Sequence, residues 1–241
     1  MKAVIFDIDN TVYSYDVCNN KGEQSMYEYL LSKNYLTKEE FIALLGSAKA
    51  YVKRNNRGTA ACHNRMLYSQ HICESFGIYD PTAVIELYNA YWDNYFSVMK
   101  LFDGAEKLMH ELVGFGIRIA FCTDLTADIQ LRKLIKLGLG KIPHILVTSE
   151  EVGAEKPDRK MFETVLEKLD VPADEAVMIG DSIEKDISGA EKVGIHGILF
   201  GSESDKYDHA CNFVGLSHIL ERTQIAISTC NISQKSNNSL V

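Results

Sequence analysis

Short apolar runs that alternate with helical segments are the feature that most restricts the fold of this chain. The runs are rich in β-branched and aromatic residues, as buried parallel strands are. They cover residues 2–6, 117–122, 145–148, 176–179 and 196–200. A helical pattern precedes each of the last four runs, over residues 105–113, 127–137, 159–169 and 185–193. This alternation predicts an α/β fold, a Rossmann-like parallel sheet with helices on both faces.

A different kind of sequence, without a convincing strand, lies between the first and second runs. Thr37-Lys-Glu-Glu40 has the pattern of a capping box, and Gly77 is placed to end a helix. Asp80-Pro81 predicts the start of another helix, over residues 82–91. We therefore expect about four helices inserted into the α/β core, which the chain re-enters at the Asp103-Gly104 turn.

These patterns divide the chain into three parts. Residues 1–13 and 103–225 form the predicted α/β core, and residues 14–102 form the inserted helical domain. The last residues, 226–241, are rich in Ser, Asn, Gln and Lys. Such a polar segment buries too little apolar surface to order itself, so we expect a mobile tail.

Composition excludes some classes of function and leaves others open. The net charge of −8 disfavours nucleic acid and anionic membranes as partners, because both require a basic face. No stretch approaches the roughly 20 apolar residues that span a bilayer. The six cysteines are scattered and form no C-x-x-C pair, so we expect reduced thiols and a cytoplasmic protein. A small anionic metabolite stays possible as a partner, and the oligomeric state is open.

Polar side chains follow the predicted strands, where the loops of a parallel sheet converge. Asp7 and Asp9 follow the first strand, and Thr123 and Asp124 follow the second. Lys156 lies in the loop region after the third. After the fourth comes the acidic stretch Gly180-Asp181-Ser182-Ile-Glu-Lys-Asp186.

This set of residue types suits phosphoryl transfer. Carboxylates at one edge repel unless a divalent cation lies among them, and Mg²⁺ prefers oxygen ligands. A carboxylate can attack phosphorus and form an acyl phosphate, while a hydroxyl, backbone N–H groups and a lysine stabilise the phosphoryl oxygens. Each motif alone is more often an ordinary turn or helix cap. Their occurrence together, in this order, favours the functional interpretation.

Together these residues resemble the four motifs of the haloacid dehalogenase-like hydrolase superfamily. Asp7-Ile-Asp-Asn-Thr11 looks like the first motif, Thr123 the hydroxyl motif and Lys156 the lysine motif. The segment from Gly180 to Asp186 looks like the acidic motif. The likeness extends from residue 2 to about 200, whereas the inserted block matches only in position and helical character. The family places a helical cap there.

The resemblance implies a role for each acidic residue. Asp7 is the nucleophile and a ligand of Mg²⁺, the implied cofactor. Asp9 is the general acid and base, and its backbone carbonyl contacts the metal. Asp181 binds Mg²⁺ through its carboxylate, and Asp186 orients metal-bound waters or Lys156.

It also implies how the phosphoryl group is held. Thr123 donates a hydrogen bond to it, the backbone N–H of Asp124 contributes to the cradle, and Lys156 holds both the group and the nucleophile. The second aspartate, Asp9, points away from the dehalogenases and toward phosphatases or phosphomutases. One departure from the family is Arg159, where many relatives have proline.

The sequence thus predicts a Mg²⁺-dependent phosphatase that acts on a nucleoside monophosphate, a phosphosugar or phosphoglycolate. A phosphomutase is the alternative, although Asn10 replaces the glycine that such enzymes tend to carry. A non-catalytic phosphate-binding regulator is a weaker alternative, since every motif residue is present.

Two groups of residues in the helical block are candidates for substrate recognition. Arg54, Arg57, His63 and Arg65 could bind a second anionic group, but a solvated basic patch is the preferred interpretation. The aromatic residues Tyr88, Tyr91, Trp92, Tyr95 and Phe96 have helical spacing, which favours packing in a core. No paired histidine spacing indicates zinc, and no glycine-rich loop indicates a nucleotide cofactor.

Overall fold

A six-stranded, wholly parallel sheet organises the part of the chain that the computed structural model describes, residues 1–33 and 36–223. The predicted tail, 226–241, and the predicted end of the core at residue 225 lie outside that part. The strand order is β3-β2-β1-β4-β5-β6. The strands are β1 (Ala3–Phe6), β2 (Arg118–Thr123), β3 (Ile145–Thr148), β4 (Ala176–Gly180), β5 (His196–Phe200) and β6 (Asp208–Ala210).

The central position of β1 explains why its sequence is so apolar. Val4 pairs with Ile119 of β2 on one side and with Val177 of β4 on the other. All four residues of β1 are buried, and helices cover both faces of the sheet. The five predicted strands are confirmed to within a residue or two at their ends.

Two core elements differ from the prediction. The short strand β6 was missed because it is polar and pairs only with β5 at the edge of the sheet. The helix expected over residues 185–193 is a π-helical turn, η4 (Ile183–Ile187), followed by the short helix α9 (Ser188–Glu191). The backbone N–H of Ser182 donates to the buried carboxylate of Asp186 at 3.0 Å.

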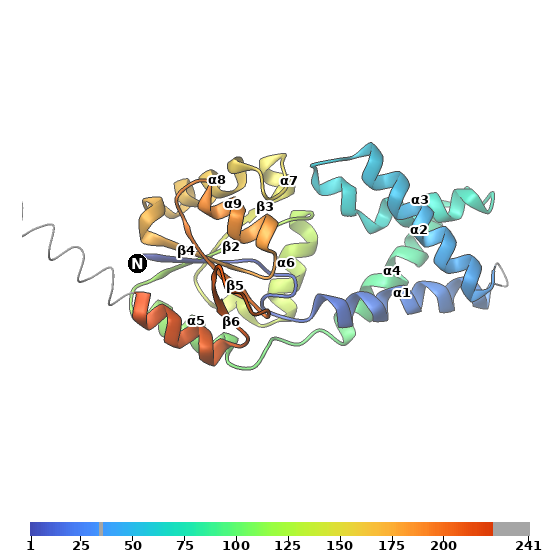
Figure 1. The fold of residues 1–241 in the computed structure, drawn as a ribbon. Coiled ribbons are helices and arrows are strands. Elements are labelled where there is room, and N and C mark those ends of the chain that lie inside the picture. Colours follow the sequence, from blue (N-terminus) through green and yellow to red (C-terminus); the bar gives the residue numbers. More distant parts are fainter. Residues whose placement is uncertain (34–35, 224–241) are drawn as a thin grey trace, which may run out of the picture.

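The helices cover the sheet in two layers, as predicted. Helices α5 and α6 and the helical residues 213–223 pack on one face with β1, β2 and β4. Helices α8 and α9 pack on the other face (Figure 1). The bounds are α5 (Ala105–Gly114), α6 (Ala127–Lys136) and α8 (Arg159–Leu169). The core also contains the short helix α7 (Ser149–Val152) and the 3₁₀ turns η2 (Leu139–Lys141) and η3 (Ala173–Glu175).

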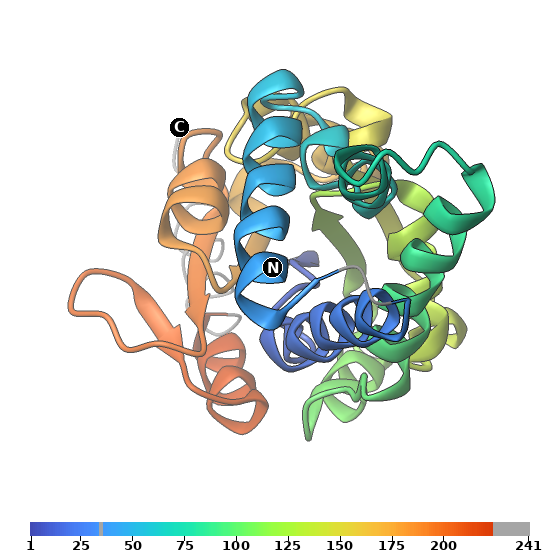
Figure 2. The same cartoon turned by 90° about the vertical axis from the view of Figure 1, so that its right-hand side faces the viewer.

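Four further α-helices lie beyond the carboxyl ends of the strands (Figure 1), and the view along the strands shows them in front of the sheet (Figure 2). They are α1 (Tyr15–Ser32), α2 (Lys38–Asn55), α3 (Arg65–Ser75) and α4 (Pro81–Ser97), with the 3₁₀ turn η1 (Ala60–His63) between α2 and α3. We call them the four-helix segment. Its apolar core is continuous with that of one sheet face. The assignment of residues 14–102 as a separate cap domain stays a prediction.

The expected helix signals work as predicted within this segment. The Thr37 side chain accepts from the backbone N–H of Glu40, whose carboxylate accepts from Thr37 in return. Asp80 caps α4, and Pro81 is its first residue. Helix α4 continues six residues past the predicted end at Tyr91, because its aromatic residues keep the helical spacing through Phe96.

The two connections between the sheet and the four-helix segment run side by side. Tyr13, which leaves β1, forms a β-bridge with Leu101, which returns from α4. The backbone N–H of Phe102 donates to the carbonyl of Val12 at 2.9 Å. The chain therefore enters and leaves the four-helix segment at one place.

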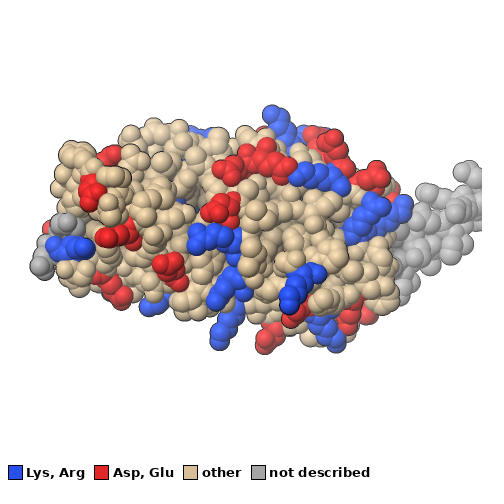
Figure 3. All heavy atoms as spheres, turned by 180° about the vertical axis from the view of Figure 1, so that it is seen from behind, with Lys and Arg blue, Asp and Glu red and all other residues tan. Residues whose placement is uncertain are grey.

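The surface charge and the apolarity of the helices are relevant to the prediction that neither nucleic acid nor a membrane is a partner. On the face shown in Figure 3, acidic and basic side chains are interspersed. Among the described helices, none is both long enough and apolar enough to cross a membrane. The absence of nucleic acid and membrane partners stays a prediction, as does the cytoplasmic location.

Candidate active site

A cavity of about 290 Å³ lies where the carboxyl ends of the strands face the four-helix segment. The six predicted catalytic, substrate-binding and metal-binding residues all line it. They are Asp7, Asp9, Thr123, Asp124, Lys156 and Asp181. Asp7 directly follows β1, Thr123 is the last residue of β2, and Asp181 directly follows β4. The parallel sheet therefore brings together residues that are up to 174 positions apart in the sequence.

Lys156 forms the centre of a buried ion-pair group. Its Nζ lies 2.6 Å from Oδ1 of Asp7 and 2.6 Å from Oδ1 of Asp186. Burial opposes its charge, but the carboxylates of Asp186 and Asp7 hold the pKa of Lys156 above its ordinary value. Burial raises the pKa of Asp7, and the ammonium of Lys156 acts against that rise. Asp186 thus contacts Lys156, one of the two positions expected for it.

Three carboxylates form a group that fits a divalent cation. Oxygen atoms of Asp7, Asp181 and Asp186 lie within 4.8 Å of one another. Burial and the nearby Asp186 raise the pKa of Asp181 to about 6. Crowding of this kind is relieved when a hard cation with oxygen ligands, such as Mg²⁺, lies among the carboxylates. The carboxylate of Asp9 is not in this group, and its predicted contact with metal through the backbone carbonyl stays a prediction.

Asp9 has a partner that sequence reasoning missed. Nζ of Lys133, on α6, lies 2.6 and 2.9 Å from the two carboxylate oxygens of Asp9, and the hydroxyl of Tyr13 donates to the same carboxylate. Burial favours the neutral acid, but Lys133 outweighs it and lowers the pKa of Asp9. The carboxylate is therefore ionised in this state of the protein.

A signal for Lys133 was present in the sequence. The buried face of α6 consists of Ile129, Gln130, Lys133 and Leu134. Two polar residues thus occupy the apolar stripe of an amphipathic helix, and Lys133 is fully buried. Such a position is rare for a lysine without a charged partner.

Gln130, the other polar residue of that stripe, positions the predicted hydroxyl. Its Nε2 donates to Oγ1 of Thr123 at 2.8 Å. Leu125, two residues after Thr123, has a φ of 87°, which is strained for a bulky side chain. Its backbone N–H donates to Oγ of Ser149 at 2.9 Å, which holds the loop in place.

Asp124 uses its side chain within the site. Its carboxylate accepts from the backbone N–H of Lys156 at 2.9 Å and from Nζ of Lys185 at 2.9 Å. Both contacts tie the loops after β2, β3 and β4 together. The predicted contribution of its own backbone N–H to a phosphate cradle stays a prediction.

The four-helix segment adds a cation, and this corrects the sequence interpretation. Arg65 is buried and lines the cavity, so the preferred interpretation of a solvated basic patch is wrong for this residue. Its guanidinium donates to the Tyr15 hydroxyl at 2.6 Å and to the His63 carbonyl at 2.7 Å. Aromatic rings from α1, α3 and α4 surround it: Tyr15, Tyr68, Tyr91 and Trp92.

The other candidates of the helical block behave differently from Arg65. Arg54 and Arg57 are exposed and line a separate hollow, as the solvated interpretation predicts. His63 is partly buried and lines the active-site cavity. The aromatic residues of α4 pack in the core as predicted, and Trp92 also lines the cavity.

Comparisons with known proteins agree with this geometry. The family profile described as "haloacid dehalogenase-like hydrolase" matches residues 1–194. A "Ribulose-1,5-bisphosphate 5-phosphatase" of Halopiger xanaduensis is 41% identical over 212 residues, which cover 86% of this chain and 89% of that protein. A "Glyceraldehyde 3-phosphate phosphatase" of Methanopyrus kandleri is 30% identical, over 81% of this chain and 82% of the relative.

Solved structures share the fold. A "HAD phosphatase" from Thermococcus onnurineus has a TM-score of 0.71 at 24% identity, and the match covers 91% of this chain and 98% of that chain. A "2-Haloacid Dehalogenase" from Pseudomonas syringae has a TM-score of 0.75 at 21% identity, over 92% and 99% of the two chains.

Proposed function

Because the chain belongs to the haloacid dehalogenase-like hydrolase family and is a phosphoric monoester hydrolase, we propose that it is a Mg²⁺-dependent phosphatase of sugar bisphosphates. One phosphate of the substrate would lie at Asp7, and the other would pair with Arg65. The proposal thus selects the phosphosugar among the substrate classes that the sequence left open.

The observation that carries this proposal is the charge of Arg65. Its side chain lines the cavity and is buried, yet within the described part of the chain no carboxylate lies within ion-pair distance of it. Hydroxyls, an amide oxygen and a carbonyl satisfy its donors, and none of them carries a negative charge. Arg65 helps to lower the pKa of Asp9, but the Asp9 carboxylate is already paired with Lys133. A buried charge without a counter-ion is costly, so a ligand that brings an anionic group gains affinity here.

The relatives support the same class of substrate. The relative at 41% identity is named for a substrate with two phosphates, and it spans nearly the whole chain. The relative at 30% identity is named for a phosphorylated triose. Both substrates are sugar phosphates. The bisphosphate also has a second phosphate, which would pair with Arg65.

The residues of the sheet edge account for the first half of the reaction. The carboxylate of Asp7 attacks phosphorus while Lys156 and the Thr123 hydroxyl, which Gln130 orients, hold the phosphoryl oxygens. When bound at Asp7 and Asp181, Mg²⁺ would neutralise charge between the carboxylate and the phosphate. The bond from phosphorus to the ester oxygen breaks, and Asp9 gives that oxygen a proton.

The state of Asp9 changes during this cycle. It is ionised in the absence of substrate because of Lys133, but an anionic ester beside it raises its pKa by like-charge repulsion and allows it to take up a proton. After the sugar leaves, the Asp9 carboxylate removes a proton from water. That water attacks the acyl phosphate, and Asp7 and inorganic phosphate are released.

A substrate panel tests the proposal. We would measure kcat/KM for phosphate release from ribulose 1,5-bisphosphate, glyceraldehyde 3-phosphate, phosphoglycolate and a nucleoside monophosphate, with Mg²⁺ and with a chelator. The sugar bisphosphate should give the highest value, and chelation should abolish every activity. Equal or better use of the nucleotide would contradict the substrate class, and conversion of a sugar phosphate to its isomer without phosphate release would indicate a mutase.

A further inference from the structure

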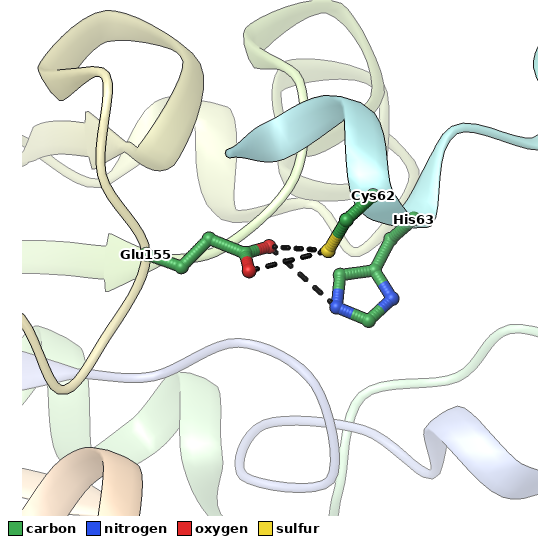
Figure 4. A group of neighbouring side chains, drawn as sticks. All are labelled: Cys62, His63 and Glu155. Carbon is green, nitrogen blue, oxygen red and sulfur yellow. Dashed lines mark hydrogen bonds and ion pairs between the residues drawn. The ribbon is translucent and has the colours of Figure 1, made fainter. Parts of the chain in front are cut away.

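Three potential metal ligands meet between the four-helix segment and the sheet, away from the carboxylate group described above. Cys62 and His63 are neighbours on η1, and Glu155 lies in the loop that precedes Lys156. Sγ of Cys62 lies 3.2 Å from each carboxylate oxygen of Glu155, and Nε2 of His63 lies 3.5 Å from Oε1. Figure 4 shows the thiol and the imidazole directed toward the carboxylate.

We propose that Cys62, His63 and Glu155 form a binding site for a borderline-soft divalent cation of the Zn²⁺ class. Thiolate, imidazole and carboxylate are the ligands that Zn²⁺ takes in proteins, and softer donors disfavour Mg²⁺ and Ca²⁺. Three protein ligands leave one tetrahedral position open for water or a substrate oxygen.

The geometry is close to what such an ion requires. With metal–ligand bonds of about 2.0–2.3 Å, ligand atoms of a tetrahedral site lie roughly 3.3–3.8 Å apart. The thiol–carboxylate and imidazole–carboxylate separations of 3.2 and 3.5 Å are already near this range. The thiol and the imidazole lie at most 4.8 Å apart, so side-chain rotation that moves a ligand atom by about 1 Å brings all three ligands to tetrahedral spacing.

The surroundings of Cys62 and His63 determine whether these side chains carry a proton that a cation must displace. Burial, with the positive charge of Lys185, lowers the pKa of His63 to about 4, which leaves the imidazole neutral and able to ligate. Burial and the hydrogen bond to Glu155 raise the pKa of Cys62 to about 12. The ion would bind the thiolate and release that proton to solvent. Lys185 and Lys53 oppose a cation here, although Lys185 is itself paired with Asp124.

The position of this site suggests an effect on turnover. Its ligands come from both the four-helix segment and the loop after α7, and Glu155 immediately precedes Lys156, which contacts Asp7. A bound ion would tie the four-helix segment to the lysine loop and hinder exchange of substrate and product. We therefore expect Zn²⁺ to inhibit the enzyme even when Mg²⁺ is saturating.

Cobalt binding tests the site without reference to activity. The full chain would be titrated with Co²⁺ in excess Mg²⁺, and absorbance would report thiolate-to-cobalt charge transfer, which carboxylates alone do not produce. We expect the band to saturate at one equivalent, to disappear in Cys62→Ser and to need at least tenfold more Co²⁺ in Glu155→Gln. Cys211→Ser, which changes an exposed cysteine, is the matched control and should retain the band.

Two outcomes would overturn the proposal. One is the absence of a charge-transfer band in the wild-type protein, and the other is a band of undiminished strength in Cys62→Ser. Thermal melting of each variant checks that it folds. If Cys62→Ser does not fold, the weaker cobalt binding expected of Glu155→Gln tests the site instead. For the inhibitory effect, Cys62→Ser should need at least tenfold more Zn²⁺ than Cys211→Ser for half inhibition, and equal sensitivity would refute it.

Discussion

The edge of the sheet and the four-helix segment line the same cavity but carry charge in different ways. At the sheet edge three lysines contact carboxylates: Asp9 pairs with Lys133, Asp124 pairs with Lys185, and Asp7 and Asp186 share Lys156. In the four-helix segment, Arg65 lies among aromatic rings and hydroxyls, without a carboxylate in ion-pair contact in the described part of the chain.

This difference separates chemistry from selection. These lysines hold the carboxylates of the sheet edge in position before a substrate arrives, so the same groups can act on any phosphate ester. The opposite wall has a positive charge without a direct ion pair among the described residues, so we expect it to distinguish among esters. Substitutions on the two sides should therefore have effects of different kinds.

The largest loss should follow from a change at the sheet edge that affects every substrate. We expect Asp7→Asn to reduce kcat by at least about 10⁴-fold for all esters, because it removes the nucleophile. Steady-state kinetics with several esters would measure this. Asp174→Asn, an exposed aspartate near the amino end of β4, serves as control and should be neutral. Substantial activity in Asp7→Asn that is not due to deamidation would show that another residue attacks phosphorus.

A change in the opposite wall should instead be selective. We expect Arg65→Gln to lower kcat/KM for a sugar bisphosphate by about 100-fold or more, since the second phosphate loses its charged partner. With para-nitrophenyl phosphate, which has one anionic group, the loss should stay within about threefold. Arg54→Gln changes an exposed arginine of the same segment and is the control. Equal losses with both substrates would remove the distinction between the two regions.

Lys133 tests whether the sheet edge works as a set of positioned pairs. We expect Lys133→Met to reduce kcat by about 100-fold for an alkyl phosphate, whose leaving oxygen needs a proton from Asp9. The loss should be under about tenfold for para-nitrophenyl phosphate, which leaves readily without one. Lys136→Met, an exposed lysine of the same helix, controls for the substitution. Similar losses for both esters would indicate a purely structural role.

The smallest expected effect concerns His63, which lies where the two regions meet. Its imidazole should titrate near pH 4 in metal-free protein, well below the ordinary value of about 6.5, and NMR would measure this. Since the unfolded chain then binds the proton at higher pH than the folded one, His63 lowers the free energy of unfolding as pH falls from 6.5 toward 4. His63→Gln should lose less stability over that interval. Titration near 6.5 would contradict this account.

The same two regions differ in how far their sequence predicted them. The sheet and its motifs were predictable because buried strands are short apolar runs and parallel topology brings their ends together. Asp7, Thr123, Lys156 and Asp181 line one cavity as expected. The polar strand β6 and the π-helical turn before α9 were not predicted, since neither has an apolar pattern of its own. The short helix α7 and the helical residues 213–223 were not predicted either.

The opposite wall was harder to predict for a physical reason. Whether a cation is solvated or buried depends on which helix faces pack together, and that arrangement is set by tertiary contacts rather than by local pattern. Arg54 and Arg65 look alike in the sequence, yet one is exposed and the other is enclosed by rings from three helices. Lys133 is the intermediate case, because its place on an apolar helix face was visible but its partner was not.

The paired connections at Tyr13 have a consequence for the timing of the reaction. Any rotation of the four-helix segment must turn about this one place, and Tyr13 lies in it. The hydroxyl of Tyr13 contacts both Asp9 at the edge of the sheet and Tyr95 of α4 in the four-helix segment. Rotation of the helices would therefore displace the Tyr13 side chain and disturb its hydrogen bond to Asp9. Under the proposed mechanism, hydrolysis of the phosphoryl group on Asp7 depends on this hydrogen bond, so we expect opening of the four-helix segment and turnover to alternate.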